Sequence, residues 1–186
     1  MKDIILASAS PRREFLLKQL IKDFKIVPSN VKETYPETLN LLEVPLYISN
    51  LKAFDIYLNN SQSIVIGCDT AIVYQNKLIG KPLNKQDAFN TLSSFSDNWH
   101  YVVSGVTIYS DNKKYEINSI NKVYFKKISP EEINEYLQLD EYKDKAGSYA
   151  IQGVAAKFID KIEGEYEAII GLPIAELSEI LKSLIK

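Results

Sequence analysis

Hydroxyl and arginine side chains gather directly after the first apolar run of the chain. Ser8, Ser10, Arg12 and Arg13 follow residues 4–7, which are Ile-Ile-Leu-Ala. Ser10 is suited to cap a helix that has Pro11 in its first turn. A helix N-terminus presents unpaired N–H groups and the positive end of the helix dipole, and neighbouring arginines add charge-assisted donors. The segment therefore favours a phosphate site, although a capped helix with solvated arginines explains it equally well.

Asp69 occupies a similar place after a second apolar run, residues 63–67, and is followed by Thr70. In α/β folds, ligands gather beyond the carboxyl ends of strands. A carboxylate at such a place can hold a metal ion or accept a proton from water. The competing interpretation is an aspartate that ends a strand by bonding its own backbone.

Four further side chains have the right chemistry for a nucleotide but are ambiguous when taken singly. Lys52 and Lys81 could each reach a triphosphate as a point charge. Glu33 could be a second metal ligand, and Gln152 could read a base edge through its amide. A solvated lysine or glutamate, or an edge-strand glutamine, is the more common role of such residues.

The single cysteine and the single histidine restrict the chemistry. With only Cys68 and His100 in 186 residues, an intrachain disulfide and a His-pair metal motif are excluded, and a cysteine-based zinc site is strongly disfavoured. Oxygen ligands must then hold any metal, which favours Mg²⁺ or Mn²⁺. A Cys68 nucleophile is disfavoured because its flanking strand is apolar, and a hydrogen-bonded structural role is favoured for His100.

The overall charge argues against a nucleic-acid partner. Lys and Arg number 22 against 24 Asp and Glu, for a formal net charge of -2, whereas a general nucleic-acid binder carries a basic excess. The first apolar run is too short for a signal peptide, and no stretch approaches the roughly 18 uninterrupted apolar residues of a membrane span. We expect a cytoplasmic protein without a membrane partner.

Apolar periodicity and turn residues predict the elements that position these side chains. Helices are expected from Pro11 onward and over residues 43–59, 85–95, 130–139 and 173–184, and strands over 4–7, 24–27, 63–67, 71–74, 77–79, 101–110 and 114–125. Residues 149–162 are strand-like around Gly153. The helix over 43–59 is expected to bury a side made of Val44, Tyr47, Leu51, Phe54 and Leu58. Helices and strands alternate without a linker, which predicts one α/β domain over residues 1–186 with a mixed sheet.

Five segments, taken together and in order, resemble the Maf family. Single motifs of this kind are weak, but five in register along one domain are specific. The segments are residues 5–17 (ILASASPRREFLL), 67–70 (GCDT), 80–82 (GKP), 144–153 (DKAGSYAIQG) and 171–173 (GLP).

The resemblance implies an activity and a fold. A Maf-like chain is expected to be a nucleoside triphosphate diphosphatase that cleaves between the α- and β-phosphates and releases pyrophosphate. The implied fold is that of inosine triphosphatases, a long mixed sheet with flanking helices in two lobes around a central cleft. Asp69 would accept the proton of the attacking water or hold the metal, with Glu33 as the second ligand of Mg²⁺ or Mn²⁺. Ser8, Arg13, Lys52 and Lys81 would line the phosphate site. A homodimer fits the family.

The resemblance also points to a branch of the family. Arg12, Thr70 and Gln152 match the branch that acts on dTTP and UTP, or on modified pyrimidine triphosphates, rather than the branch that acts on 7-methyl-GTP. Ser104 stands where the family usually has Thr, and Asn121 likewise replaces a Thr. Two alternatives stay open: a nucleotide-binding regulator of cell division without turnover, and a phosphohydrolase of damaged purine triphosphates.

Overall fold

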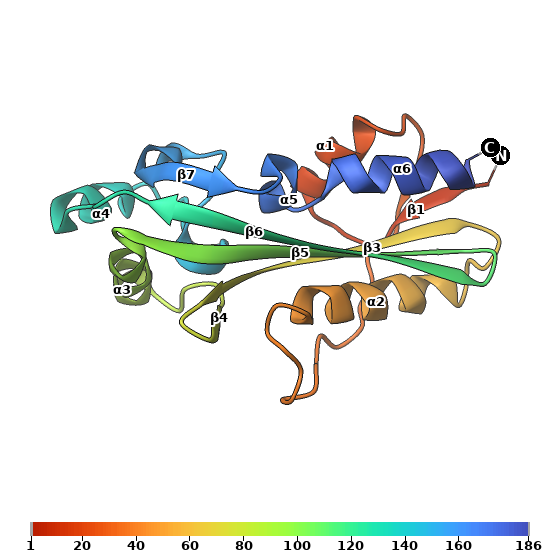
Figure 1. Ribbon diagram of the computed structural model, residues 1–186, viewed down its shortest axis with the longest axis horizontal. Helices are drawn as coiled ribbons and strands as arrows, with labels where there is room; N and C mark the ends of the chain where they lie inside the picture. The colour runs from red at the N-terminus through yellow and green to blue at the C-terminus, as the bar shows by residue number, and fades with distance from the viewer. Residues whose placement is uncertain (1, 186) are drawn as a thin grey trace. The chain divides into compact units, whose positions relative to one another are not determined.

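The structure, a computed structural model, describes residues 2–185 and has the alternating helices and strands expected of an α/β chain (Figure 1). The strands are β1 Ile4–Leu6, β2 Lys25–Ile26, β3 Ile64–Tyr74, β4 Lys77–Ile79, β5 Asn98–Ser110, β6 Lys113–Phe125 and β7 Ile159–Glu163. The α-helices are α1 Pro11–Lys18, α2 Val44–Tyr57, α3 Lys85–Phe95, α4 Pro130–Tyr136, α5 Tyr166–Ile170 and α6 Ile174–Leu184, and the short 3-10 helices are η1 Ala146–Ser148 and η2 Val154–Phe158.

One mixed sheet collects the strands in the order β2-β1-β3-β5-β6-β7, with β4 paired to β3. β1 lies parallel to β2 and to β3, while β4 and β7 lie antiparallel to β3 and β6. This confirms the mixed sheet that the sequence predicts. Two-residue turns join β3 to β4 and β5 to β6, and all four turn residues have the positive φ angles that such hairpins require: 47° and 56° at Gln75–Asn76, 52° and 59° at Asp111–Asn112.

The chain forms two compact units, and each is built from segments that are not contiguous in the sequence. The first unit comprises Met1–Thr70, Val103–Ser119 and Glu167–Lys186, and the second comprises Ala71–Val102 and Ile120–Tyr166. The strands β3, β5 and β6 contribute residues to both units. Within residues 2–185, no helix has both the length and the apolar character needed to cross a membrane.

In the first unit, α2 covers one face of the sheet and α6 the other (Figure 1). The side of α2 expected from the sequence is wrong except at Val44, which is buried: Phe54 and Leu58 are 46% and 64% exposed, whereas Ile48, Ala53 and Ile56 are buried. Apolar residues occur on more than one side of this helix, so periodicity alone does not identify the side that faces the core. Small residues decide the outcome, because Ala53 permits a close approach of α2 to the sheet that a larger side chain prevents.

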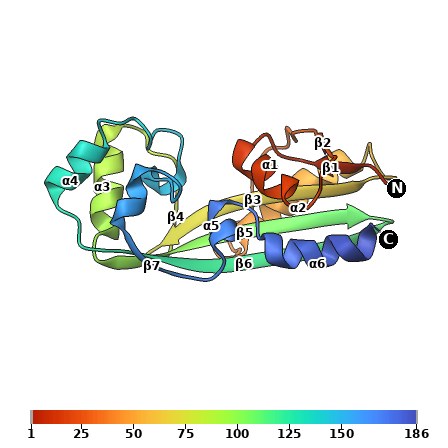
Figure 2. The same ribbon diagram turned by 90° about the horizontal axis from the view of Figure 1, so that it is seen from above.

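In the second unit, α3 packs beside α4 (Figure 2), and aromatic rings fill the interior. The ring of Phe95 stacks on His100 with 4.2 Å between centroids, and both contact Phe125 and Tyr149 edge-on. The prediction of strand-like structure over residues 149–162 is wrong except at its end, where β7 begins. A turn and η2 occupy residues 151–158 instead. In η2 the buried residues Ala155 and Phe158 are three residues apart, which suits a helical turn rather than an alternating strand.

Candidate active site

A lysine ammonium group lies between two carboxylates in the first unit. Lys52 Nζ is 2.8 Å from Glu33 Oε1 and 2.8 Å from Asp69 Oδ1. The side chains of Lys52 and Asp69 are only 12% and 17% exposed, whereas that of Glu33 is 55% exposed. We call these three residues the carboxylate–lysine cluster. It unites three residues that lie far apart in the sequence, which are ambiguous when taken singly and which the Maf resemblance assigns to one site.

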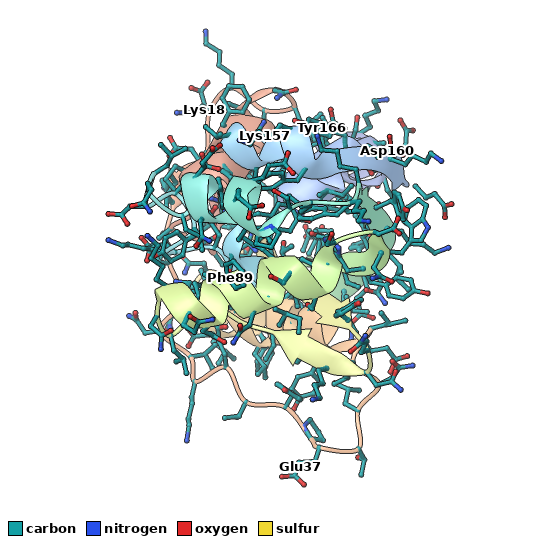
Figure 3. The ribbon with its side chains drawn as sticks, turned by 90° about the vertical axis from the view of Figure 1, so that its left-hand side faces the viewer. Lys18, Glu37, Phe89, Lys157, Asp160 and Tyr166 are labelled. Atoms are coloured by element: carbon teal, nitrogen blue, oxygen red, sulfur yellow. The ribbon has the colours of Figure 1, made fainter. Side chains whose placement is uncertain are left out.

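Regular elements position the two buried members of the cluster. Lys52 lies on α2 and Asp69 on β3, and the two elements meet at Gly67. A Cβ atom at Gly67 would lie 2.3 Å from the carbonyl oxygen of Ser49 and 2.7 Å from Cβ of Ala53, so only glycine fits there. The third member, Glu33, comes from the long connection between β2 and α2, which loops outward to Glu37 (Figure 3).

Asp69 does not follow the end of a strand, as the sequence suggests, but lies within one. β3 continues through Asp69 to Tyr74, because Thr70, Ile72 and Val73 favour extended backbone and β4 pairs with this second half. Residues 64–68 and 72–73 of the strand are buried, whereas Asp69 and its two successors are partly exposed, as is the terminal Tyr74. The carboxylate therefore stands on a rigid element with limited access to solvent.

Burial raises the pKa of Asp69 above its ordinary value. Desolvation is the main cause, and the negative charge of Glu33 adds to it, while the Lys52 ammonium and the Arg13 guanidinium oppose it. A carboxylate whose pKa is raised accepts protons more readily when ionised. The site thus contains a buried base whose charge is balanced by a neighbouring cation.

Arg13 is fixed by three uncharged acceptors. Its guanidinium donates to Ser8 Oγ at 3.1 Å, to Thr70 Oγ1 at 3.2 Å and to the carbonyl oxygen of Gly171 at 3.2 Å. The hydroxyl of Ser10 caps α1 by accepting from the backbone N–H of Arg13 at 3.5 Å, which confirms the predicted cap. These acceptors orient the guanidinium without neutralising its charge, so the positive charge of Arg13 stays available to bind an anion.

A chain of hydroxyl groups behind Arg13 has a fixed direction. Ser104 Oγ donates to the carbonyl oxygen of Ala168 at 2.6 Å and lies 2.8 Å from Thr70 Oγ1. Because the one proton of Ser104 goes to that carbonyl, Thr70 must donate to Ser104, which leaves its lone pairs for Arg13. The sequence offers no local signal for this role of Ser104, a fully buried residue inside an apolar strand.

The remaining predicted site residues lie elsewhere. Arg12 is exposed next to Arg13 at the start of α1, and desolvation of its guanidinium together with the adjacent Arg13 charge lowers its pKa. Lys81 and Gln152 belong to the second unit, where both are exposed. The backbone N–H of Gly147 donates to the carbonyl oxygen of Gly80 at 3.1 Å, which ties the Gln152 segment to the Lys81 segment. Their contribution to the site stays a prediction, as does that of Arg12.

The donor set suits a hard divalent cation that a ligand helps to hold. Among residues 2–185, no three His, Cys, Asp or Glu side chains converge on one point. Glu33 and Asp69 do converge, since each contacts the same Lys52 nitrogen. Mg²⁺ is commonly held by one or two carboxylates plus substrate phosphates, so these two carboxylates fit such an ion and would not form a complete cage by themselves.

Cys68 and His100 are both unsuited to reaction chemistry. Burial raises the pKa of the Cys68 thiol to about 11, so the thiolate needed by a nucleophile does not form near neutral pH. Burial lowers the pKa of His100 to about 3, and its Nε2 lies 2.7 Å from the hydroxyl of Tyr149. These observations favour a structural role for each.

Comparison with known proteins places the chain in a family. Residues 3–184 match the family model described as Maf-like protein. The dTTP/UTP pyrophosphatase of Alkaliphilus metalliredigens is 41% identical over 97% of this chain and 95% of that protein, and the one of Vibrio vulnificus (strain YJ016) is 40% identical over the full length of both. The fold is similar to that of a HAM1 protein from Coxiella burnetii, with a TM-score of 0.54 at 12% identity, over 98% of this chain and all of that one. The family model and these relatives agree with the motifs of the sequence, and the chain belongs to the Maf-like protein family.

Proposed function

We propose that the chain hydrolyses dTTP and UTP to the nucleoside monophosphate and pyrophosphate. The observation that carries this proposal is the carboxylate–lysine cluster, a buried base and a buried cation side by side on rigid elements. The names of the relatives, dTTP/UTP pyrophosphatases similar over nearly the full chain, support the same reaction. The protein is then a nucleoside triphosphate diphosphatase, and the cytoplasm, where nucleotide pools are maintained, is the location that goes with this activity.

The reaction requires one water molecule and one base. The ionised carboxylate of Asp69 accepts a proton from the water as its oxygen attacks the α-phosphorus. The bond between the α-phosphorus and the oxygen that bridges to the β-phosphate breaks, and that oxygen leaves with pyrophosphate. Lys52 lies beside the Asp69 carboxylate and stabilises the negative charge that develops on the phosphate oxygens.

The cations at α1 hold the triphosphate. Arg13, oriented by Ser8 and Thr70, offers its charge to phosphate oxygens, and Arg12 adds a second cation at the same end of the helix. We expect Lys81 to provide a third cation. A divalent ion, Mg²⁺ or Mn²⁺, held by Glu33 and Asp69 together with the substrate, would supply Lewis-acid polarisation of the phosphate oxygens.

Gln152 reads the base in this proposal. Its amide offers one acceptor and donors, which complement the N3–H and the 4-carbonyl of uracil and thymine. Cytosine presents the opposite pattern at these two positions. The chain is therefore expected to prefer dTTP and UTP over dCTP and CTP.

The test is pyrophosphate release from a panel of nucleoside triphosphates, with and without Mg²⁺, by the wild-type protein and the Asp69→Asn variant. We expect metal-dependent release led by dTTP and UTP, and a loss of about 10³-fold in kcat for Asp69→Asn with an unchanged unfolding midpoint. Nucleotide binding without release by the wild type would indicate a regulator instead. Faster pyrophosphate release from ITP than from dTTP would indicate that the substrates are purine rather than pyrimidine triphosphates.

A further inference from the structure

The segment that carries Gln152 is held by a tyrosine and a glutamate that come earlier in the chain. The carboxylate of Glu141 accepts from the backbone N–H of Val154 at 3.0 Å through Oε2. Its other oxygen lies 3.4 Å from the hydroxyl of Tyr136, which also lies 3.2 Å from the carbonyl oxygen of Ser148. The two side chains thus contact both ends of residues 148–154, which we call the Gln152 loop.

Gln152 occupies the middle of this loop and has a defined place in a turn. The backbone N–H of Gly153 donates to the carbonyl oxygen of Ala150 at 3.0 Å, so Gln152 is the third residue of a four-residue turn. Its own side chain is exposed. No regular strand fixes the direction of this amide, and the contacts at the two ends of the loop must do so.

Glu141 also fills the space beside the turn. A Cβ atom at Gly153 would lie 2.0 Å from Glu141 Oε1, so the carboxylate packs directly against the backbone next to Gln152. Tyr136 is fully buried, and burial, reinforced by the charge of Glu141, raises its pKa, so that the hydroxyl keeps its proton. A retained proton is what the tyrosine needs to donate to the loop carbonyl or to the carboxylate.

The loop itself is strained where Tyr136 contacts it. Gly147 and Ser148 have φ angles of 68° and 64°, and the second of these is unusual for a residue other than glycine. A conformation of this kind persists only where its surroundings enforce it. The contacts from Tyr136 to Ser148 and from His100 to Tyr149 supply that enforcement.

We infer that Glu141 and Tyr136 are positioning residues for Gln152 and thereby determine which base the enzyme accepts. They touch neither the nucleobase nor the phosphates; they fix the turn from which the Gln152 amide projects. The inference rests on the proposed function, because it assigns to these two residues the selectivity of that same reaction.

Three substitutions test the inference through the ratio of kcat/KM for UTP to kcat/KM for CTP. Glu141→Ala removes both carboxylate contacts and is expected to lower the ratio about 10-fold, the value of one or two hydrogen bonds. Tyr136→Phe removes one hydroxyl and is expected to lower it less. Glu141→Gln keeps an acceptor for Val154 and lets Tyr136 donate to Ser148, so it is expected to retain most of the selectivity.

The decisive measurement is a double-mutant cycle with Gln152→Ala. If Glu141 acts through Gln152, then Glu141→Ala changes the UTP/CTP ratio in the wild type but not in the Gln152→Ala background. Glu163→Gln is the matched control, since Glu163 is a more exposed glutamate of the same unit whose partner is Lys122 at 2.9 Å. Hydrogen exchange of the loop gives a readout independent of turnover, and faster exchange of the Val154 amide is expected in Glu141→Ala.

The outcomes separate the inference from the proposed function. An active wild type whose UTP/CTP ratio is unchanged by Glu141→Ala overturns the inference alone. Equal effects of Glu141→Ala with and without Gln152 would also overturn it, since Glu141 would then act by another route. A wild type that releases no pyrophosphate from any nucleotide overturns the proposed function and, with it, the inference.

Discussion

The two units hold their proposed functional side chains in different ways. In the first unit, Lys52 on α2, Asp69 on β3 and Arg13 on α1 all lie on regular elements, and side-chain contacts join Lys52 to Asp69 and Arg13 to Thr70. In the second unit, Lys81 follows β4 and Gln152 lies in a turn, both exposed, and the Gln152 turn is held through its backbone by neighbours. In the proposed function, rigid elements thus carry the reaction chemistry, and turns carry the recognition of the nucleobase.

This difference has a physical reason. The Asp69 carboxylate and the Lys52 ammonium must stay at a fixed separation to act together. The elements α2 and β3 give that separation because no side chain intervenes between them at Gly67. Recognition of a nucleobase tolerates small shifts of the side chain that contacts it, and sequence changes are accepted most readily in turns. We therefore expect substitutions in the first unit to alter kcat, and those in the Gln152 loop to alter selectivity.

After Asp69→Asn, the largest effect is expected for Lys52→Met, which leaves two carboxylates without their cation. We expect kcat/KM for dTTP to fall about 100- to 1000-fold, because a charge that stabilises the phosphate oxygens is lost. Lys52 also lowers the pKa of Asp69, so its removal raises that pKa further. The acid limb of the pH–rate profile, where activity is lost as Asp69 becomes protonated, should move to higher pH.

Lys122→Met provides the matched comparison for Lys52→Met. Lys122 pairs with Glu163 at 2.9 Å, but both side chains are largely solvated, and an exposed pair of this kind contributes little. Its kcat/KM and pH profile should equal those of the wild type. An acid limb that stays in place in Lys52→Met would separate Lys52 from the protonation of Asp69.

The next largest effect is expected for Gly67→Ala, which tests the rigidity of the α2–β3 contact. The added methyl group would meet the backbone carbonyl of Ser49 at 2.3 Å, and backbone cannot rotate away. We expect a loss of about 3 kcal/mol in the free energy of unfolding, typical of overpacking, measured by urea denaturation. A stable variant with full activity would show that Lys52 and Asp69 do not depend on this close approach.

The sequence predicts local structure better than it predicts packing between segments that lie far apart in the chain. Strong local signals succeed: α3 begins at Lys85 and ends at Phe95 as predicted, and the hairpin turn at Gln75–Asn76 is confirmed. The motifs also identify Asp69 and Lys52, which the structure brings into contact. Periodicity fails where long-range packing decides, as in the buried side of α2, which is selected by its contact with Gly67.

Other features leave no trace that a single sequence can show. Residues 149–158 contain enough β-branched and aromatic residues to predict a strand, yet the positive φ angles at Gly147 and Ser148 turn the chain first. Ser104 looks like one more small residue in an apolar strand, and its function depends on Thr70 and Ala168, which are distant in sequence. Glu141 is equally inconspicuous until the loop folds against it.

A smaller effect is expected for Ser104→Ala, which removes one link of the hydroxyl chain. Thr70 loses the acceptor for its proton and can turn that proton toward Arg13, which weakens the orientation of the guanidinium. We expect KM for dTTP to rise about 10-fold, as for the loss of one hydrogen bond to a charged group, with the UTP/CTP ratio unchanged. Ser104→Thr, which keeps the hydroxyl, should restore KM, and a change in the UTP/CTP ratio would blur the division between the two units.

The smallest effect is expected for Gly153→Ala, the counterpart of Gly67→Ala in the second unit. Both positions lack room for a methyl group, but at Gly153 the obstacle is the end of the Glu141 side chain, which can rotate, rather than backbone. We expect a cost of about 1 kcal/mol in the free energy of unfolding, from the displaced carboxylate and its lost bond to Val154. In the Glu141→Ala background the obstacle is absent, so Gly153→Ala should then cost almost nothing. Equal costs in both backgrounds would mean that the backbone of the turn, and not Glu141, requires glycine, and the contrast between a rigid and an adjustable contact would fail at this position.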